Sequence, residues 1–210
     1  MKFINFFRVA LAVCILPILG ACQQQEGRQR QIDNSPMPVV ASPPYGCDYI
    51  PLRALEIMTG TRNPLTDGSF DLGNSEEGGR GICAVYRSDG DRRRVMIISL
   101  TPSGTREIVE DNLKEGALPL PEIVPGAIGY YFAPRDSDKN DAYAHLISAR
   151  NETLNVQMSH GAPGRDNAAD VAALMKLIAP KLLSADNTPS ASPTASASPT
   201  VKKSEEPGEG

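Results

Sequence analysis

The feature that most constrains this chain is a short motif at the end of its apolar amino-terminal stretch. A run of apolar residues at positions 9–19 follows a basic segment, and Gly20 and Ala21 then precede a cysteine, Cys22. This order is typical of a lipoprotein signal peptide, which is cleaved before a cysteine whose thiol is acylated. The sequence therefore predicts a signal peptide at 1–21 and Cys22 as the lipid-carrying first residue of the mature chain.

The predicted lipid determines where the protein resides. The apolar run is too short, and too interrupted by Pro17, for a transmembrane helix. Two or three acyl chains, at about 0.8 kcal/mol per buried methylene, hold a protein stably on a bilayer. We therefore expect an exported protein that is lipid-anchored to the outer face of a bacterial cell membrane. A plain secreted protein, the rival interpretation, would leave Cys22 as an unpaired thiol in an oxidising compartment.

Two segments lack apolar periodicity and are expected to be disordered. Residues 22–44 are rich in Gln and Pro, a composition typical of a semi-flexible tether. Residues 184–210 form a tail rich in Ser, Thr, Ala and Pro, which also suits O-glycosylation. The remaining residues, 45–183, have the length of a single domain.

The cysteine count predicts one disulfide. Cys14 leaves with the signal peptide and Cys22 is acylated, so Cys47 and Cys83 remain in a compartment that permits disulfides. Two cysteines allow only one pairing. Without a nearby histidine they cannot complete a tetrahedral zinc site, and a catalytic thiol would need a paired base that the sequence does not show.

Apolar spacing predicts three helices in the domain. They are expected at 51–59, 105–115 and 166–183, and Pro180 should kink or end the last one. The residues expected to face inward from the second helix are Ile108, Val109 and Leu113.

Alternating or short apolar runs predict five strands, at 82–87, 93–101, 127–133, 142–149 and 153–159. An Asp-Gly turn joins the first two, and a short polar turn joins the last two, so both pairs are expected to be hairpins. Residues 61–81 are polar and rich in glycine and are interpreted as a loop. The predicted class is α+β: an antiparallel sheet of about five strands packed by helices on one face, with one disulfide.

The arrangement resembles a family of actinobacterial lipoproteins. The shared features are the lipidation motif, a polar linker, Cys47 before a short helix that stops at Gly60, and Cys83 in a strand that begins a hairpin. The resemblance covers about residues 45–183 and implies a small exported α+β domain of unknown function, with no catalytic residues to carry over. The chain differs where the family has a tryptophan shortly after the second cysteine, because it has no tryptophan at all.

Charge argues against a nucleic-acid partner. The net charge is −4, and the basic cluster at 92–94 follows two aspartates, so it is interpreted as part of a charged hairpin. Nucleic-acid modules usually show a basic stripe, and this cluster is the only basic one in the sequence. The alternative interpretation of the cluster is a contact with an anion or an acidic lipid.

Few residues suggest chemistry. Residues 136–147 begin like a calcium loop, but its sixth position is Asp141 instead of Gly and its twelfth is Ile147 instead of Glu. His145 lies in a predicted strand and is interpreted as structural. His160 begins a loop that leads into a helix amino terminus, where anions are favoured. The sequence predicts no catalytic residues, no metal and no cofactor.

These observations favour a non-catalytic cell-envelope lipoprotein whose tethered domain binds another envelope component, such as a protein. The alternative is a carrier or sensor of a small apolar, lipid-like ligand, held in a groove between sheet and helix. An enzyme of unrecognised type is the third hypothesis, because residues distant in sequence can assemble an active site.

Overall fold

The computed structural model of the protein describes residues 33–73, 78–134 and 140–184. All of them belong to one unit of the chain, which excludes residues 1–31. None of the helices in this described part is long and apolar enough to cross a bilayer.

Four sequence predictions concern residues outside those ranges. They are the signal peptide, the lipidated Cys22, the tail after Ser184, and the acidic start of the calcium-like loop at 136–139.

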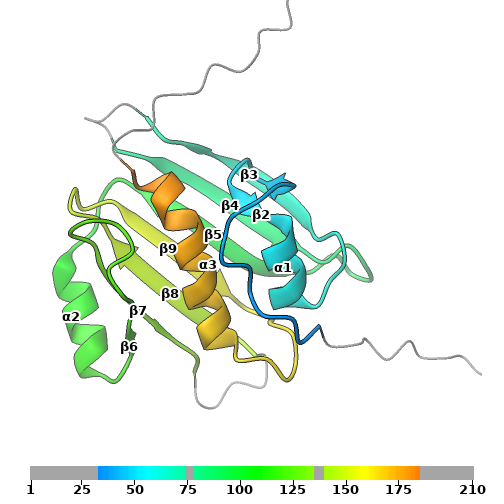
Figure 1. Ribbon diagram of the computed structural model, residues 1–210. Helices are drawn as coiled ribbons and strands as arrows, with labels where there is room; N and C mark the ends of the chain where they lie inside the picture. The colour runs from blue at the N-terminus through cyan, green and yellow to red at the C-terminus, as the bar shows by residue number, and fades with distance from the viewer. Residues whose placement is uncertain (1–32, 74–77, 135–139, 185–210) are drawn as a thin grey trace, which may run out of the picture. The chain divides into compact units, whose positions relative to one another are not determined.

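A seven-stranded antiparallel sheet forms the centre of the domain (Figure 1). In spatial order its strands are β3 (Leu65–Asp71), β4 (Arg80–Tyr86), β5 (Arg94–Thr101), β9 (Thr153–Met158), β8 (Ala142–Ile147), β7 (Ile128–Phe132) and β6 (Leu118–Pro119). A separate two-stranded sheet consists of β1 (Tyr45–Gly46) and β2 (Ile50–Pro51). The predicted α+β class and both hairpins are confirmed, with seven strands in the main sheet instead of about five.

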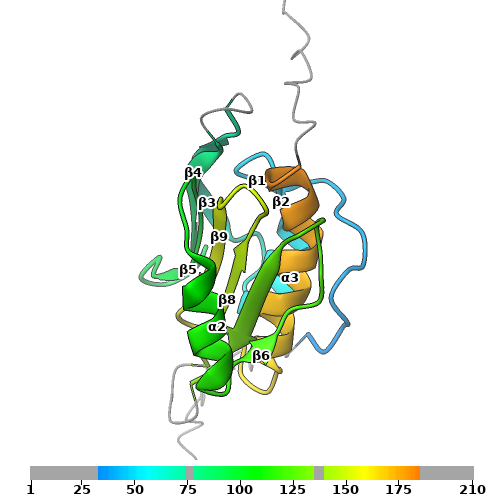
Figure 2. The ribbon, with the colours of Figure 1, turned by 90° about the vertical axis from the view of Figure 1, so that its left-hand side faces the viewer.

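The helices lie on both faces of this sheet. They are α1 (Leu52–Thr59), α2 (Arg106–Lys114) and α3 (Asn167–Leu182). Figure 2 shows α3 on one side of the sheet and α2 on the other, and α2 contacts β7 and β8. The expectation of helices on one face therefore describes α1 and α3, whereas α2 covers part of the opposite face.

The helix ends follow local sequence signals. α1 stops at Gly60, whose left-handed backbone, with a φ of 64°, lets its N–H donate to Glu56 O at 2.9 Å. At the start of α3 the Asp166 side chain accepts a hydrogen bond from Ala169 N at 3.0 Å. Pro180 does not end α3, which continues to Leu182. Pro180 is exposed and lies in the last turn, and because it has no N–H the carbonyl of Lys176, four residues earlier, lacks its intrahelical donor.

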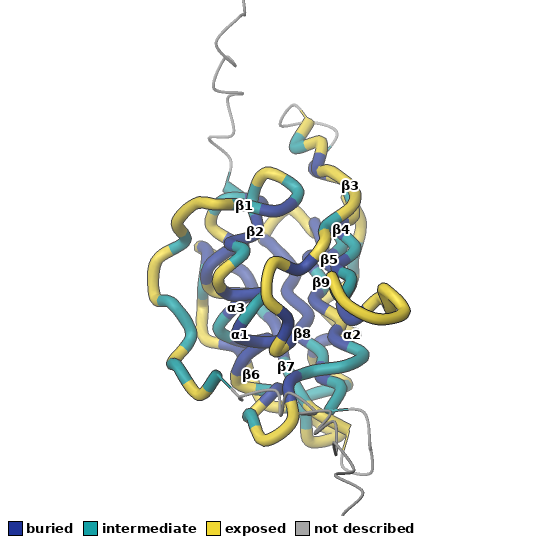
Figure 3. Tube along the Cα trace, turned by 90° about the vertical axis from the view of Figure 1, so that its right-hand side faces the viewer, coloured by how far each residue is buried: buried dark blue, intermediate teal, exposed yellow. Residues whose placement is uncertain are grey.

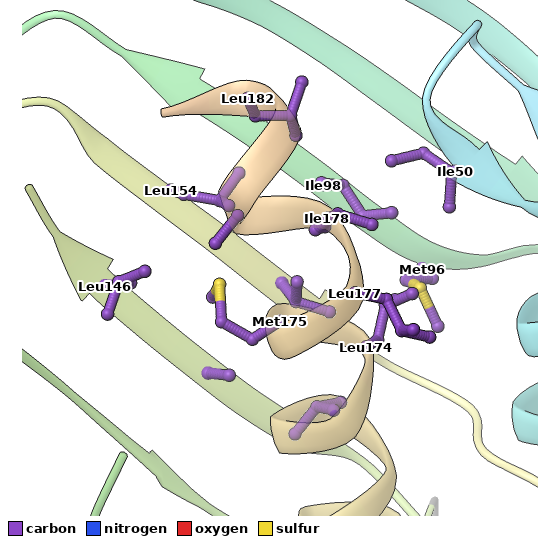
Figure 4. Packing of buried hydrophobic residues seen from close by; sticks show 14 of the residues in the cluster. Ile50, Met96, Ile98, Leu146, Leu154, Leu174, Met175, Leu177, Ile178 and Leu182 are labelled. Atoms are coloured by element: carbon purple, nitrogen blue, oxygen red, sulfur yellow. The ribbon is translucent and has the colours of Figure 1, made fainter. Parts of the chain in front are cut away.

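The main core lies between the sheet and the helices α1 and α3 (Figure 3). Leu154, Val156 and Met158 of β9 are buried, as the alternating pattern predicts. Figure 4 shows aliphatic side chains of α3, among them Leu174 and Ile178, packed against the side chains of the strands. This side of the sheet is almost wholly aliphatic.

The predicted disulfide is confirmed. Cys47 and Cys83 are bonded with their Cα atoms 5.9 Å apart, and Cys83 is fully buried. The bridge joins the segment before α1 to β4 and closes a loop with a sequence separation of 36. Closing a loop of that length stabilises the folded state by roughly 4 kcal/mol in the chain-entropy model.

The structure corrects the prediction of a loop at 61–81, because β3 lies within it. β3 is an edge strand paired with β4, and Phe70 is its one buried residue. An edge strand with one face exposed to water does not need alternating apolar residues, so the polar sequence of β3 does not indicate a strand.

Residues 33–44, which belong to the expected tether, lie against the domain. Arg165 Nη1 donates to Asp33 O at 2.6 Å and to Ser35 O at 3.0 Å. The side chains of Met37 and Ala41 pack against the main core. The described chain is therefore bound to the domain from Asp33 onward.

Candidate functional site

Two rows of side chains cross three neighbouring strands on the sheet face that α2 partly covers. One row consists of Phe132, Tyr143 and Gln157, and the next consists of Tyr130, His145 and Asn155. Antiparallel pairing places such partners side by side, because residues opposite each other in register point to the same face. The register of β7, β8 and β9 therefore brings aromatic and amide groups together.

The rings of these rows form one cluster. The centroid of Tyr130 is 5.2 Å from that of His145 and 6.0 Å from that of Tyr143, and Phe132 is 5.7 Å from Tyr143. Such separations fall in the range of favourable aromatic pairs.

Only part of the cluster is covered by α2. Val109 is fully buried against Tyr130 and Ile147, and Leu113 is half-buried beside them. Ile108, which the sequence placed inward, is 46% exposed. The predicted inward orientation is therefore correct for Val109, correct in part for Leu113 and wrong for Ile108.

An amide oxygen organises the hydrogen bonds beneath the rings. Tyr143 Oη donates to Asn155 Oδ1 at 2.7 Å, and His145 Nδ1 lies 2.5 Å from the same oxygen. Because an amide oxygen only accepts, Nδ1 of His145 carries the proton. Nε2 of His145 is then an acceptor, and it is buried with no partner among the described residues.

Burial keeps these groups neutral. It lowers the pKa of His145, and the hydrogen bond with Asn155 opposes that shift only in part. Burial also raises the pKa of Tyr143 to about 12 and raises the pKa of Tyr130. At neutral pH the cluster carries no charge.

A shallow pocket of about 310 Å³ opens at one end of the sheet. There the row of Phe132, Tyr143 and Gln157 meets the residues that follow β7 and β9 and precede β8. Its aromatic lining is Tyr130, Phe132 and Tyr143. Its polar lining is Asn112, Asp141, Gln157 and Ser159. The pocket thus combines aromatic surfaces with polar side chains from α2, β9 and the start of β8.

Two polar side chains of the pocket already use a donor hydrogen within the protein. Asn112 Nδ2 already donates to Ile108 O at 2.8 Å, and Ser159 Oγ donates to Val95 O at 3.2 Å. Asp141 Oδ1 is buried and has no hydrogen-bond partner in the described part of the chain. A buried acceptor without a partner is costly, and a bound donor would satisfy it.

The residues singled out by sequence lie mostly outside this pocket. The disulfide between Cys47 and Cys83 lies on the opposite face of the sheet. His145 belongs to the second row, behind the pocket, and its exposed fraction is 6%. His160 is 3.4 Å from Arg93 Nη1, through its Nε2. Ile147 is buried in β8, and the described residues contain no cluster of three side chains able to hold a metal ion.

Sequence reasoning named one pocket residue, Asp141, as part of a calcium-like loop, and did not identify the others. One signal was present: aromatic residues recur at alternate positions, Tyr130 and Phe132 in one predicted strand and Tyr143 beside His145 in the next. Only the strand register, which the sequence does not give, shows that these residues are neighbours.

Comparison with known proteins gives no relative: no protein-family model, curated protein or solved structure matches the chain.

Proposed function

We propose that the protein is a non-catalytic binding domain, held at the outer face of a bacterial cell membrane by lipid on Cys22. Its binding site is the pocket between α2 and the ends of β7, β8 and β9. The proposal includes the resemblance to the actinobacterial lipoprotein family, which rests on the sequence features of residues 45–183. The observation that carries it is the aromatic lining beside the unpartnered Asp141 Oδ1.

The lining favours binding of a ligand with both apolar and polar parts. Phe132 and Tyr143 are half-buried, so their rings retain contact area for a ligand. Gln157 is exposed and offers an amide with both donor and acceptor groups. The carrier of a small, wholly apolar ligand has less support, because such a ligand would leave Asp141 Oδ1 without a partner and would cover the amide of Gln157.

The electrostatics of the site support a non-catalytic role. A general base works best with a pKa near the operating pH and within reach of the substrate. Burial lowers the pKa of His145, whose Nε2 is enclosed by the protein. Burial raises the pKa of Tyr143 to about 12, so its hydroxyl stays protonated. Neither group is suited to take a proton from a ligand.

Site-specific photo-crosslinking in intact cells tests the binding site. A photoreactive amino acid replaces Gln157 at the pocket, and in a matched variant it replaces Lys176, which is exposed on α3. We expect adducts in the membrane fraction at position 157 and none at 176. Equal labelling at both positions, or labelling at neither, contradicts the proposed site.

Substitution of the anchor tests the location separately. Cys22→Ala should give an unprocessed or freely secreted protein, detected by fractionation and by the mass of the amino terminus. Retention of the processed variant on membranes after a salt wash contradicts the lipid anchor.

A further inference from the structure

We infer that the pocket takes an uncharged sugar ring, free or as part of a glycan. This inference rests on the proposed binding function and names the class of its ligand. It follows from three properties of the lining: its aromatic surfaces, its available hydrogen-bond acceptors, and the spread of its polar groups around the rings.

The aromatic surfaces suit the C–H face of a sugar. Phe132 and Tyr143 are cross-strand partners with centroids 5.7 Å apart, so two rings lie side by side across adjacent strands. The faces of aromatic rings are negative and attract weakly positive hydrogens. The C–H groups on one side of a pyranose present such hydrogens, while its hydroxyl groups point outward around the ring edge.

The available acceptors of the lining favour a ligand that supplies donors. Asn112 donates one amide hydrogen to Ile108 O and Ser159 donates its hydroxyl hydrogen to Val95 O. This leaves one N–H and Oδ1 of Asn112 and the lone pairs of Ser159 Oγ available. Asp141 adds a carboxylate with one unpartnered, buried oxygen. Hydroxyl groups supply the donors, and the carboxylate disfavours anionic ligands such as phosphorylated sugars.

The distribution of polar groups distinguishes a sugar from a cation. An ammonium group concentrates its charge at one point and would leave most of the lining unused. The polar residues come from three places, with Asn112 on α2, Asp141 before β8, and Gln157 on β9. Gln157 also presents an N–H₂ group, which needs an acceptor. Hydroxyl groups both donate and accept, and a sugar carries them on several sides.

Ligand-observed NMR tests the class. The full-length protein is extracted in a detergent without a sugar headgroup and mixed with methyl α-mannopyranoside, methyl β-galactopyranoside and methyl α-arabinofuranoside. The reference compounds are choline and glucose 6-phosphate. We expect saturation transfer to at least one neutral glycoside, with a Kd on the order of 1 mM for a ligand of this size, and none to the references.

Two variants test whether the saturation-transfer signal comes from binding in the pocket. Gln157→Ala removes hydrogen bonds and should weaken binding about fivefold. Asp141→Asn keeps one acceptor oxygen and should weaken it about threefold to tenfold. Thr101→Ala, an exposed threonine of β5 outside the pocket lining, is the matched control and should bind like the wild type.

The outcomes separate this inference from the function on which it rests. Binding of choline that is abolished by Asp141→Asn, or no binding of any glycoside, overturns the sugar. If position 157 still crosslinks to a protein or lipid, the binding function stands and only the ligand class fails. If position 157 gives no adduct in cells and no glycoside binds, both fail.

Discussion

The two faces of the sheet differ in chemistry and in cover. The face under α1 and α3 is lined with aliphatic side chains, and the disulfide joins it to the segment before α1. The face under α2 has a small cluster in which rings, an imidazole and amide groups are neighbours. α2 packs mainly on β7 and β8, and the pocket lies at the end of one row.

Because of this difference, we expect the aliphatic face to determine stability and the α2 face to determine recognition. Aliphatic burial contributes about 25 cal/mol per Å² and leaves no polar group to satisfy. Buried polar groups add specificity at a cost, because each needs a hydrogen-bond partner. Asp141 Oδ1 and His145 Nε2 on the α2 side have no partner among the described residues, and the same is true of Thr61 Oγ1 after α1 and Asn167 Oδ1 at the start of α3. Changes on the aliphatic face should therefore affect stability, and changes at the pocket should affect binding.

Removal of the disulfide should have the largest effect on stability. The double variant Cys47→Ala, Cys83→Ala loses the constraint on the unfolded chain, and its free energy of unfolding should fall by about 4 kcal/mol in urea titrations. Reductant should destabilise the wild type and have no further effect on the variant. A loss below about 1 kcal/mol would show that the bridge is not what holds this face together.

A cavity in the aliphatic core should have the next largest effect. Leu174 of α3 is fully buried, so Leu174→Ala should lower the free energy of unfolding by about 3 kcal/mol, within the usual range for such sites. Leu118 of β6 is 51% exposed, and Leu118→Ala should stay within about 0.5 kcal/mol of the wild type. Similar losses in both variants would contradict the concentration of stability on this face.

Much of the aliphatic face could be predicted from sequence. The alternation of β9 and the apolar stripe of α3 each indicate one buried side, and two available cysteines allow one disulfide. The edge strand β3 could not be predicted, because its pairing with β4 depends on backbone hydrogen bonds and not on apolar side chains.

The pocket could not be predicted for a different reason. Asn112, Asp141 and Gln157 come from three separate elements, and each taken alone is an ordinary polar residue. The amphipathic pattern of α2 gives an inward face, but the pattern does not say which side of the sheet receives it. The site exists because α2 crosses to the second face and ends beside the aromatic row.

The smallest expected effect is a pH dependence on the α2 face. Burial between Tyr130 and Tyr143 lowers the pKa of His145, so its stabilising contribution is complete above pH 6.5, the usual value. Below that pH the unfolded chain binds a proton that the folded state resists, and stability falls toward the lowered pKa. The free energy of unfolding of the wild type should therefore fall more than that of His145→Gln when the pH is lowered from 7.5 to 5.5. The difference between the two falls should be smaller than the loss caused by Leu174→Ala. Thr101→Ala, an exposed and non-titrating position of β5, is the control and should keep the wild-type difference. Equal pH profiles for the wild type and His145→Gln would contradict a buried neutral imidazole.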